Sequence, residues 1–344
     1  MPPSTQDSKL EPELQLRLHD LMVKSRVLEE TLISMTKSGD GYFWIGGPGE
    51  EAFNVPLGLL VDKGEGPAHD YLHLHYRSSA ILVAMGAQMI DSIRQMRSVA
   101  TDPYSGGRNF VNHFSVHAWN VVPVSPTIEV QYAMAPGTAR VQKREGGTGI
   151  TIVNGGDAGA AEGDFATCLN WSSRPGQELP VLILVDHNKY GISTPSTEQW
   201  HLQDISKRAE PFGIRRALVD GNDPEASWQA LSEAMAYIRK ERKPFCLQAN
   251  VSRLYGHSSS SGAARVDERD CIAEWEGKLA ARGLLSEERA KAVWEKYRQE
   301  AKAALAQVRE EPFPPPEDIW SHVYAETDGS VGHAGRTTGE RTEG

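Results

Sequence analysis

The sequence predicts an α/β fold: a doubly wound, mostly parallel sheet with helices on both faces. Two apolar runs, residues 149–154 and 182–185, flank a segment, 160–169, whose apolar residues recur at helical spacing. The second run is continuously apolar, as in a strand covered on both faces. A strand–helix–strand unit with two parallel strands follows, and 344 residues that are 39% apolar suffice for a substantial core.

Further elements are expected on both sides of this unit. Helices are expected at 17–37, from 50, from 78, at 131–139, at 226–242 and over most of 267–310, and a buried strand at 244–251. We divide the chain into a flexible N-terminal segment (1–15), an α/β domain (16–265), a helical C-terminal region packed on that domain (266–326) and a disordered tail (327–344).

Charge and composition exclude several classes of protein. A net charge of -10 and a pI near 5.6 argue against nucleic-acid or membrane-surface partners, which require a basic face. There is no long apolar run and no secretory signal, so we expect a cytoplasmic protein without a membrane span. Cys168, Cys246 and Cys271 lack Cys-x-x-Cys spacing, which favours buried free thiols over a metal site or disulfide.

A glycine-rich turn follows the first strand of the unit. Asp157 lies in this turn, and Asn188 follows the next strand, 31 positions along the chain. Because the carboxyl ends of parallel strands meet at one edge, these side chains should lie close together. A carboxylate, an amide oxygen, main-chain carbonyls and phosphate oxygens suit magnesium (Mg²⁺). We therefore expect a clamp for a metal-bridged diphosphate; a generic nucleotide-binding turn is the simpler alternative.

These residues resemble the signature of the alpha subunit of thiamine-diphosphate-dependent 2-oxoacid dehydrogenases, the E1 component. That signature is a Gly-Asp-Gly turn followed by a paired Asn and Tyr-Ala-Ile-Ser. Here the turn reads Gly156, Asp157, Ala158 and Gly159, and the second part is 187–193, with His187 in place of the first Asn. The resemblance implies thiamine diphosphate as cofactor, the diphosphate-binding fold, and magnesium held by Asp157, the Asn188 side chain and the Tyr190 carbonyl.

Other matches extend the resemblance to residues 16–326. It implies that Tyr76 and Arg77 contact the diphosphate, and that the turn carrying Ser125 and Thr127 meets the aminopyrimidine. His257, in the Arg-x-x-Gly-His-Ser-like loop, and His113 would be catalytic. Phe43 and Trp44 would shape the acyl pocket, while His73 and His75 are expected to be packing residues because no third metal ligand is evident.

Departures from the family pattern limit what is carried over. The segment 127–130 lacks the Thr-Gln that some members use around potassium, so the resemblance does not decide whether a potassium site is present. Ser258 matches a regulatory phosphorylation site of animal enzymes, but no acidic stretch follows it, so this control is not expected. The Gly107–Arg108 to His113 segment is most similar to branched-chain enzymes.

The expected function is oxidative decarboxylation of a 2-oxoacid, of the branched-chain 2-oxoisovalerate type, with reductive acylation of a lipoyl group on an E2 partner. Chains of this kind lack the pyrimidine-binding half, so we expect a separate beta subunit and an α2β2 heterotetramer. The alternatives are a pyruvate or acetoin dehydrogenase, a nonoxidative thiamine enzyme, which chain length disfavours, and a noncatalytic scaffold subunit, which the altered glycine turn would suit.

Overall fold

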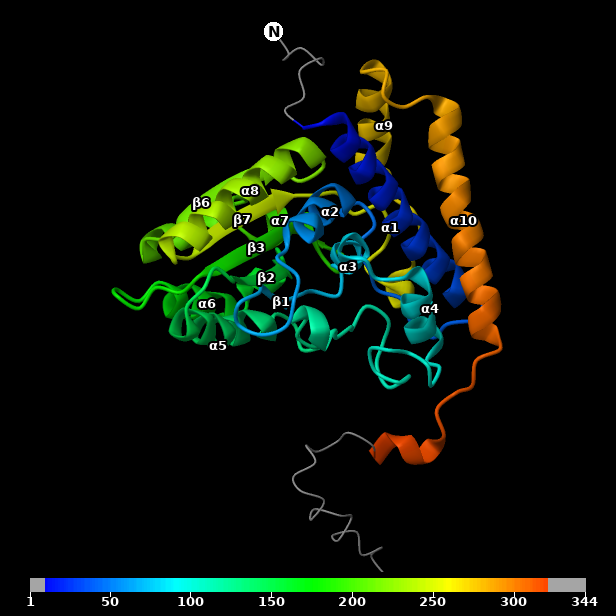
Figure 1. Cartoon of the computed structure of the whole chain (residues 1–344), viewed down its shortest axis with the longest axis horizontal. Helices are drawn as coiled ribbons and strands as arrows, with labels where there is room; N and C mark the ends of the chain where they lie inside the picture. Colours follow the sequence, from blue (N-terminus) through cyan, green and yellow to red (C-terminus); the bar gives the residue numbers. More distant parts are fainter. Residues whose placement is uncertain (1–9, 321–344) are drawn as a thin grey trace, which may run out of the picture.

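A computed structural model describes residues 10–320 of the chain. At its centre is a parallel five-stranded sheet in the order β1-β2-β3-β7-β6 (Figure 1). The strands are β1 (Tyr71–His73), β2 (Thr151–Gly156), β3 (Val181–His187), β6 (Arg215–Asp220) and β7 (Phe245–Asn250). A two-stranded antiparallel hairpin, β4 (Tyr190–Gly191) with β5 (Thr194–Pro195), follows β3. The predicted parallel sheet is confirmed.

Helices cover both faces of the sheet, as a doubly wound fold requires. One face packs against α5 (Val130–Glu145), α6 (Gly163–Ser172) and the 3₁₀ helix η3 (Ile205–Phe212). The other packs against α2 (Glu51–Leu60), α3 (Ser79–Met85) and α8 (Pro224–Glu241). Successive side chains of β3 point to opposite faces of the sheet. Ile183 and Val185 pack in the core beneath α5, α6 and η3, whereas Leu182 and Leu184 pack in the core beneath α2, α3 and α8.

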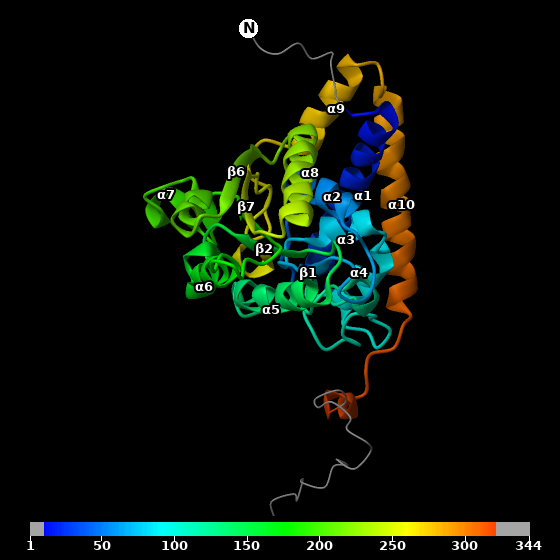
Figure 2. The ribbon, with the colours of Figure 1, turned by 60° about the vertical axis from the view of Figure 1, so that its left-hand side comes forward.

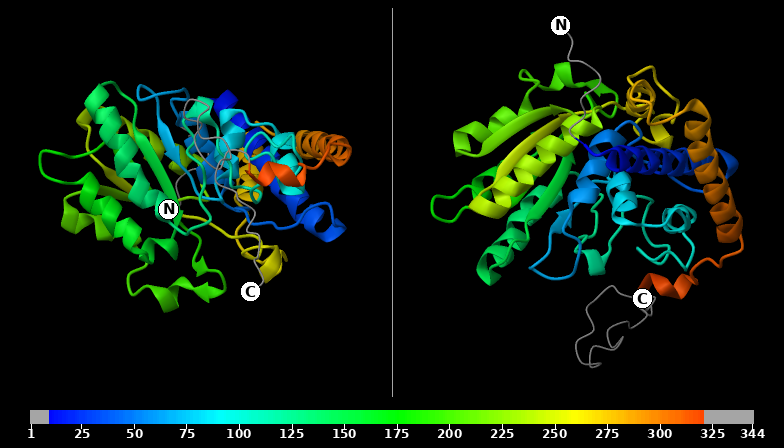
Figure 3. Two further views of the ribbon diagram at one scale, coloured as in Figure 1. Left: turned by 90° about the horizontal axis from the view of Figure 1, so that it is seen from below. Right: turned by 45° about the horizontal axis from the view of Figure 1, so that its top comes forward.

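A third layer of helices packs on α2 and α3. It consists of α1 (Pro12–Ser38), α4 (Met89–Arg97), α9 (Cys271–Ala281) and α10 (Glu287–Arg309), and α10 runs beside α1 (Figures 2 and 3). α1 begins at Pro12, so residues 12–15 are helical and not part of a flexible segment, because proline suits the first helical position. The remaining 3₁₀ and helical turns are η1 (His117–Trp119), η2 (Gly159–Ala161), α7 (Ser196–Gln199), η4 (Ser259–Ser261) and η5 (Pro316–Trp320).

Several simpler expectations can be compared directly with the structure. Cys168, Cys246 and Cys271 are free and buried, as predicted. Residues 101–126 form a long connection whose regular structure is limited to turns, isolated bridges and η1, in line with their lack of a period. Among the described residues, no helix is both long and apolar enough to cross a membrane. The predicted tail, 327–344, lies outside the described residues.

A buried ion pair joins the third layer to the helices beneath it. Arg26 of α1, 1% exposed, donates from Nε to Glu51 Oε1 (2.6 Å) and from Nη2 to Glu51 Oε2 (2.8 Å). Its Nη1 donates to Asp270, the residue before α9 (2.9 Å). One guanidinium therefore fixes α1, the start of α2 and the start of α9 relative to one another.

We predict that Arg26→Met lowers the free energy of unfolding by about 3–5 kcal/mol, because it leaves the buried Glu51 carboxylate without its cation. Denaturant unfolding in one assembly state measures the change. Lys291→Met, which breaks the exposed pair with Glu287, serves as the control and should cost about 0.5 kcal/mol or less. Equal losses for the two variants would contradict the assigned role of Arg26.

Candidate active site

The carboxyl ends of the strands gather the predicted site residues at one edge of the sheet. In the register of β2 and β3, Gly156 lies opposite Asp186, so Asp157 and His187 emerge next to each other. Asp157 is 1% exposed, and its Oδ2 lies 3.5 Å from His187 Nε2. Asp157 Oδ2 has no hydrogen-bond partner among the described residues. The structure thus provides a buried carboxylate oxygen that lies near His187 but accepts no hydrogen bond.

Arg77 joins three distant parts of the chain at this edge. Its guanidinium is buried, and Nη1 donates to the Gly46 carbonyl (2.6 Å) while Nη2 contacts His257 Nδ1 (2.9 Å). Burial and the nearby Arg77 charge lower the pKa of His257 to about 4. His257 is therefore neutral at physiological pH. Because Arg77 can only donate, Nδ1 accepts and the ring proton is on Nε2.

Aromatic rings continue the site from His257 toward the long loop. Tyr76 lies edge-on to His257 at 6.2 Å between ring centroids and is stacked with His113 at 6.1 Å. Phe110 lies 5.9 Å from His113 and 5.5 Å from Phe43. The structure thereby brings both predicted catalytic histidines next to Tyr76. Desolvation lowers the pKa of His113, so it too is a neutral imidazole.

The loop after β3 presents Asn188 toward α2. Asn188 Oδ1 accepts from the Tyr190 main-chain N–H (3.2 Å), and Nδ2 donates to Glu50 Oε1 (3.3 Å). Glu50 directly precedes α2, but its carboxyl makes no cap hydrogen bond and is buried against Asn188. A Glu-Glu pair after a run of glycines was the available signal, but it does not distinguish capping from burial.

Ala158, which replaces a glycine of the family turn, is accommodated by another glycine. A Cβ built on Gly191 would lie 2.7 Å from the Ala158 Cβ and 2.8 Å from Gln199 Oε1. A side chain at 191 would therefore collide with the turn. The methyl group of Ala158 occupies the space that Gly191 leaves free.

Glu129 was not identified as a site residue from the sequence, yet its carboxyl fills the inside of the glycine turn. Glu129 Oε1 accepts from the Gly156 N–H (3.0 Å), and Oε2 accepts from Gln131 Nε2 (3.0 Å). A Cβ on Gly155 or Gly159 would lie 2.0 or 1.9 Å from these carboxyl oxygens. Glu129 has a left-handed backbone, φ 61°, at the start of α5, which directs the side chain under the turn.

Four carboxyl groups are buried within this edge, and burial is the main cause of their shifted titration. It raises the pKa of Asp157 to about 6, of Asp186 to about 7 and of Glu129 to about 8, and it raises the pKa of Glu50 well above its usual range. Part of this set is therefore protonated at neutral pH, which reduces its repulsion of an anionic ligand beside Arg77.

The donor set at this edge suits a hard cation in partnership with a ligand. Within residues 10–320, no group of three or more His, Cys, Asp and Glu side chains is arranged to hold a metal. The predicted ligands are instead one carboxylate, one amide oxygen and the Tyr190 carbonyl, which need phosphate oxygens to complete an octahedral shell. The unpartnered, buried Asp157 Oδ2 fits that requirement.

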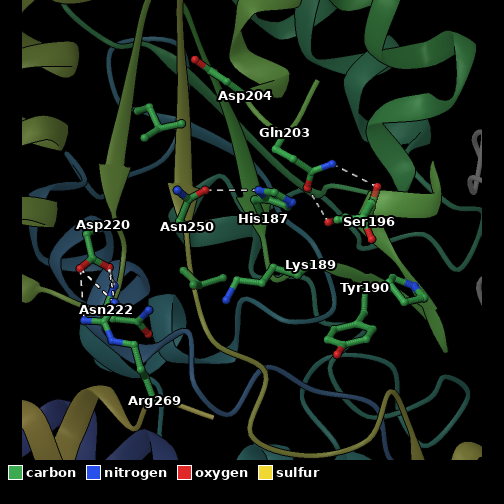
Figure 4. Close-up of a pocket in the computed structure, with 14 residues that line it drawn as sticks. His187, Lys189, Tyr190, Ser196, Gln203, Asp204, Asp220, Asn222, Asn250 and Arg269 are labelled. Atoms are coloured by element: carbon green, nitrogen blue, oxygen red, sulfur yellow. Dashed lines mark hydrogen bonds and ion pairs between the residues drawn. The ribbon is translucent and has the colours of Figure 1, made fainter. Parts of the chain in front are cut away.

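A cavity of about 790 Å³ opens beside this edge, at the carboxyl ends of β3, β7 and β6 (Figure 4). His187 forms one wall, with Nδ1 3.3 Å from Asn250 Oδ1, while the far wall carries Asp220 and its ion pair with Arg269. Ser196 and Gln203 also line the cavity. His187 therefore stands between this cavity and Asp157.

Other sequence assignments differ in outcome. Trp44 is fully buried in the helical core and donates its indole N–H to Glu29, so its predicted place in the acyl pocket is wrong; Phe43 remains near Phe110. His73 donates to or accepts from Thr138, a packing role as predicted. The Ser125 hydroxyl accepts from the Thr127 N–H, and Thr127 is exposed.

A parallel sheet whose carboxyl edge unites a glycine turn, a buried arginine and a buried carboxylate is the arrangement in which α/β enzymes bind anionic ligands. A family model described as "Dehydrogenase E1 component" matches residues 19–317, and the chain belongs to this family. The family depends on thiamine diphosphate, so the predicted cofactor and fold are confirmed at the level of the family.

Curated relatives carry names from one branch of this family. The chain is 28% identical over 317 residues to the 2-oxoisovalerate dehydrogenase subunit alpha of Bacillus subtilis, covering 90% of this chain and 94% of the relative. It is 26% identical over 332 residues to the mitochondrial 2-oxoisovalerate dehydrogenase subunit alpha of Homo sapiens, covering 94% and 73%. The predicted similarity to the branched-chain type agrees with these names.

The buried Glu129 predicts how stability depends on pH. The pKa of Glu129 rises from the ordinary 4.5 to about 8 on folding. Its contribution to the free energy of unfolding is therefore complete below pH 4.5 and is lost as the pH rises through 8. Glu129→Gln should therefore reduce the decline in unfolding free energy over this interval, by up to about 1.4 kcal/mol per pH unit. Denaturant unfolding of the cofactor-free chain across pH measures it, with the exposed Glu145→Gln as control. Parallel pH profiles for wild type and Glu129→Gln would contradict it.

Proposed function

We propose that this chain is the alpha subunit of a branched-chain 2-oxoacid dehydrogenase E1 component, working in an α2β2 heterotetramer with a separate beta subunit. The observation that carries this proposal is the meeting of Arg77 with His257, 180 positions apart, beside the unpartnered oxygen of Asp157. An anchor for a diphosphate, a neutral imidazole and a metal-binding oxygen are thereby available at one edge. The names of the relatives support the branched-chain substrate.

Asp157, the Asn188 side chain and the Tyr190 carbonyl would hold magnesium, and Arg77 and Tyr76 would hold the diphosphate of thiamine diphosphate. When bound, the cofactor supplies the carbanion-stabilising chemistry that decarboxylation of a 2-oxoacid needs. Within this chain, Arg77 offsets the diphosphate charge, and burial of its guanidinium strengthens that interaction. Ser125, Thr127 and the main chain at Gly156, Ala158 and Gly159 would complete the contacts with the cofactor.

His257 would serve as a hydrogen-bond donor toward the substrate. Arg77 occupies Nδ1, so Nε2–H is the group that remains to orient a carboxylate or transfer a proton. With its pKa held at about 4, His257 stays neutral and avoids adding a further charge beside Arg77. His113, stacked with Tyr76, would face the same substrate from the long loop. The lipoyl group of an E2 acyltransferase would accept the acyl product.

Exposed apolar side chains at this edge support a partner subunit over the site. Phe110 is 53% exposed and Ile128 43% exposed, although both border the residues described above. Burial of such side chains is the usual consequence of a subunit interface. A site open on one side is what a chain lacking the pyrimidine-binding half would present. The cytoplasmic location expected from the sequence remains a prediction.

A noncatalytic scaffold subunit is the second candidate, and Glu129 is the observation that favours it. Its carboxyl occupies the Gly156 N–H in a turn that would otherwise face a diphosphate, and three further buried carboxyl groups lie close by. A chain that no longer binds the cofactor would tolerate these groups. Titration with the cofactor distinguishes the two candidates.

We predict that the heterotetramer binds thiamine diphosphate only with magnesium, and that Asp157→Asn weakens this binding by at least about a hundredfold, since a metal ligand is lost. Calorimetric titration with and without magnesium measures the affinity. Glu162→Gln, an exposed change near the same turn, should bind like the wild type. A folded wild-type heterotetramer that binds no thiamine diphosphate would overturn the catalytic proposal in favour of the scaffold.

The substrate prediction is tested by reductive acylation of a lipoylated E2 domain. We expect kcat/KM for 2-oxoisovalerate to exceed that for pyruvate and acetoin by about tenfold or more, because a pocket shaped for a branched chain gains from each buried methyl group. Phe110→Ala should narrow this difference, since Phe110 packs beside His113. A preference for pyruvate or acetoin would reassign the substrate but leave the E1 class intact.

A further inference from the structure

Glu29 is a buried carboxyl group, outside the site, that the proposed function does not use. It lies in the second half of α1 and is 2% exposed. Three uncharged donors converge on it: the Ser79 hydroxyl, the Trp44 indole N–H (2.7 Å) and the Asn112 side-chain amide (3.1 Å). These donors belong to three segments that are distant from one another in the sequence. A single carboxyl therefore ties three segments to one helix.

Each of the three donors is adjacent to a residue of the candidate active site. Ser79 begins α3, two positions after Arg77, and Asn112 directly precedes His113. Trp44 lies two positions before Gly46, whose carbonyl accepts from Arg77 Nη1 (2.6 Å). Glu29 is thus linked to Arg77 through Ser79 and through Trp44. It is linked to His113 through Asn112.

The same segment connects Glu29 to His257. The Trp44 carbonyl accepts from the Ser259 N–H (2.8 Å), and the Trp44 N–H donates to Ser259 Oγ (3.0 Å). Ile45 forms a bridge with Ser258, the residue after His257. Asn112 reinforces the arrangement, because its amide also donates to the Ile45 carbonyl (2.8 Å). The loop that contains Trp44 and Ile45 is therefore held between Glu29 and the serine loop.

The space around the Glu29 carboxyl group is tightly packed. A Cβ on Gly46 would lie 2.1 Å from Glu29 Oε2, so the carboxyl and the loop approach as closely as a glycine allows. Asn112 has a left-handed backbone, φ 64°, that is stabilised by its two side-chain hydrogen bonds. Burial of a carboxyl is costly and raises its pKa, here to about 7, although the three donors oppose that rise. Such a group is not explained by core packing alone.

We propose that Glu29 is a positioning residue that sets the relative placement of Arg77, His113 and His257 through the segments 44–46, 79 and 112. The identity of the ligand at those three residues rests on the function proposed above. The positioning itself rests only on the contacts of this chain. Glu29 touches neither substrate nor cofactor, so its effect is indirect.

The test compares Glu29→Gln with Glu276→Gln in the assembled heterotetramer. A glutamine cannot accept from all three donors, because its amide nitrogen would face one of them. Glu276 is a matched control: it is a partly buried carboxyl near α1 that bonds His19 and the Trp294 indole N–H (2.9 Å each) but has no link to the site. Thermal unfolding of both variants measures the structural part of each change.

Hydrogen exchange gives a readout that does not need the cofactor. In Glu29→Gln we expect faster amide exchange in 44–46, 112–113 and 257–259, with the sheet unchanged. In Glu276→Gln, faster exchange should be confined to 15–20 and 290–297. Unchanged exchange of those three segments in a folded Glu29→Gln protein would overturn the proposal, whether or not the wild type binds thiamine diphosphate.

Cofactor and substrate measurements then test the consequence at the site. Glu29→Gln should weaken thiamine diphosphate binding about tenfold and lower kcat more than it changes KM, whereas Glu276→Gln should change neither. If Glu29→Gln does not fold, Asn112→Ala removes the hydrogen bonds to Glu29 and to the Ile45 carbonyl. This variant should lower kcat and weaken thiamine diphosphate binding, because it loosens both the segment before His113 and the loop 44–46. Equal site parameters for Asn112→Ala and wild type would contradict the proposal. Wild type without cofactor binding would instead contradict the proposed function.

Discussion

The parallel register of β1, β2, β3 and β7 is the constraint on which the rest of this protein depends. Ile152 pairs with Leu72 and Leu182, and Leu182 pairs with Phe245, so the four strands are aligned and end at one edge. Every group of the candidate site leaves the sheet at this edge or reaches it from a neighbouring loop. A shift of one residue would turn the core-facing side chains of β3 to the opposite layer, so the two cores maintain the alignment.

The electrostatics of the edge follow from burying more acids than bases. Arg77 is the buried cation in contact with His257 and Gly46, while Glu50, Glu129, Asp157 and Asp186 are buried carboxyl groups. Desolvation raises the pKa of each of these carboxyl groups, so some of them are protonated at neutral pH. Protonation reduces the net negative charge that Arg77 alone does not balance. An incoming diphosphate with a divalent cation would take over that neutralising role. Affinity for the cofactor would therefore be coupled to the protonation of this edge.

The departures from the family pattern are matched by local packing. Ala158 faces Gly191, which has no side chain to collide with it. His187 is held by Asn250 and by Gln248 Nε2, 3.0 Å from Nδ1, so its other nitrogen is directed at Asp157. The helical layer supports the site from the opposite side through two residues of α1. Arg26 binds Glu51 at the start of α2, and Glu29 binds Trp44 in the loop before α2. The site is therefore supported from the sheet and from the third layer together.

The sequence by itself determined the strand–helix–strand unit, the edge at which the site lies, and the position of Asp157 beside the carboxyl end of β3. These follow from apolar periodicity and from the rule that parallel strands end together, which are local or nearly local properties. Tertiary structure alone decided the roles of Trp44, Glu50, Glu129 and Glu29. Each of these side chains finds partners far along the chain, such as Asn188 for Glu50 and Gly156 for Glu129. A glutamate has the same local preference whether it caps a helix, faces solvent or fills a turn, so only the packing of distant segments distinguishes these outcomes.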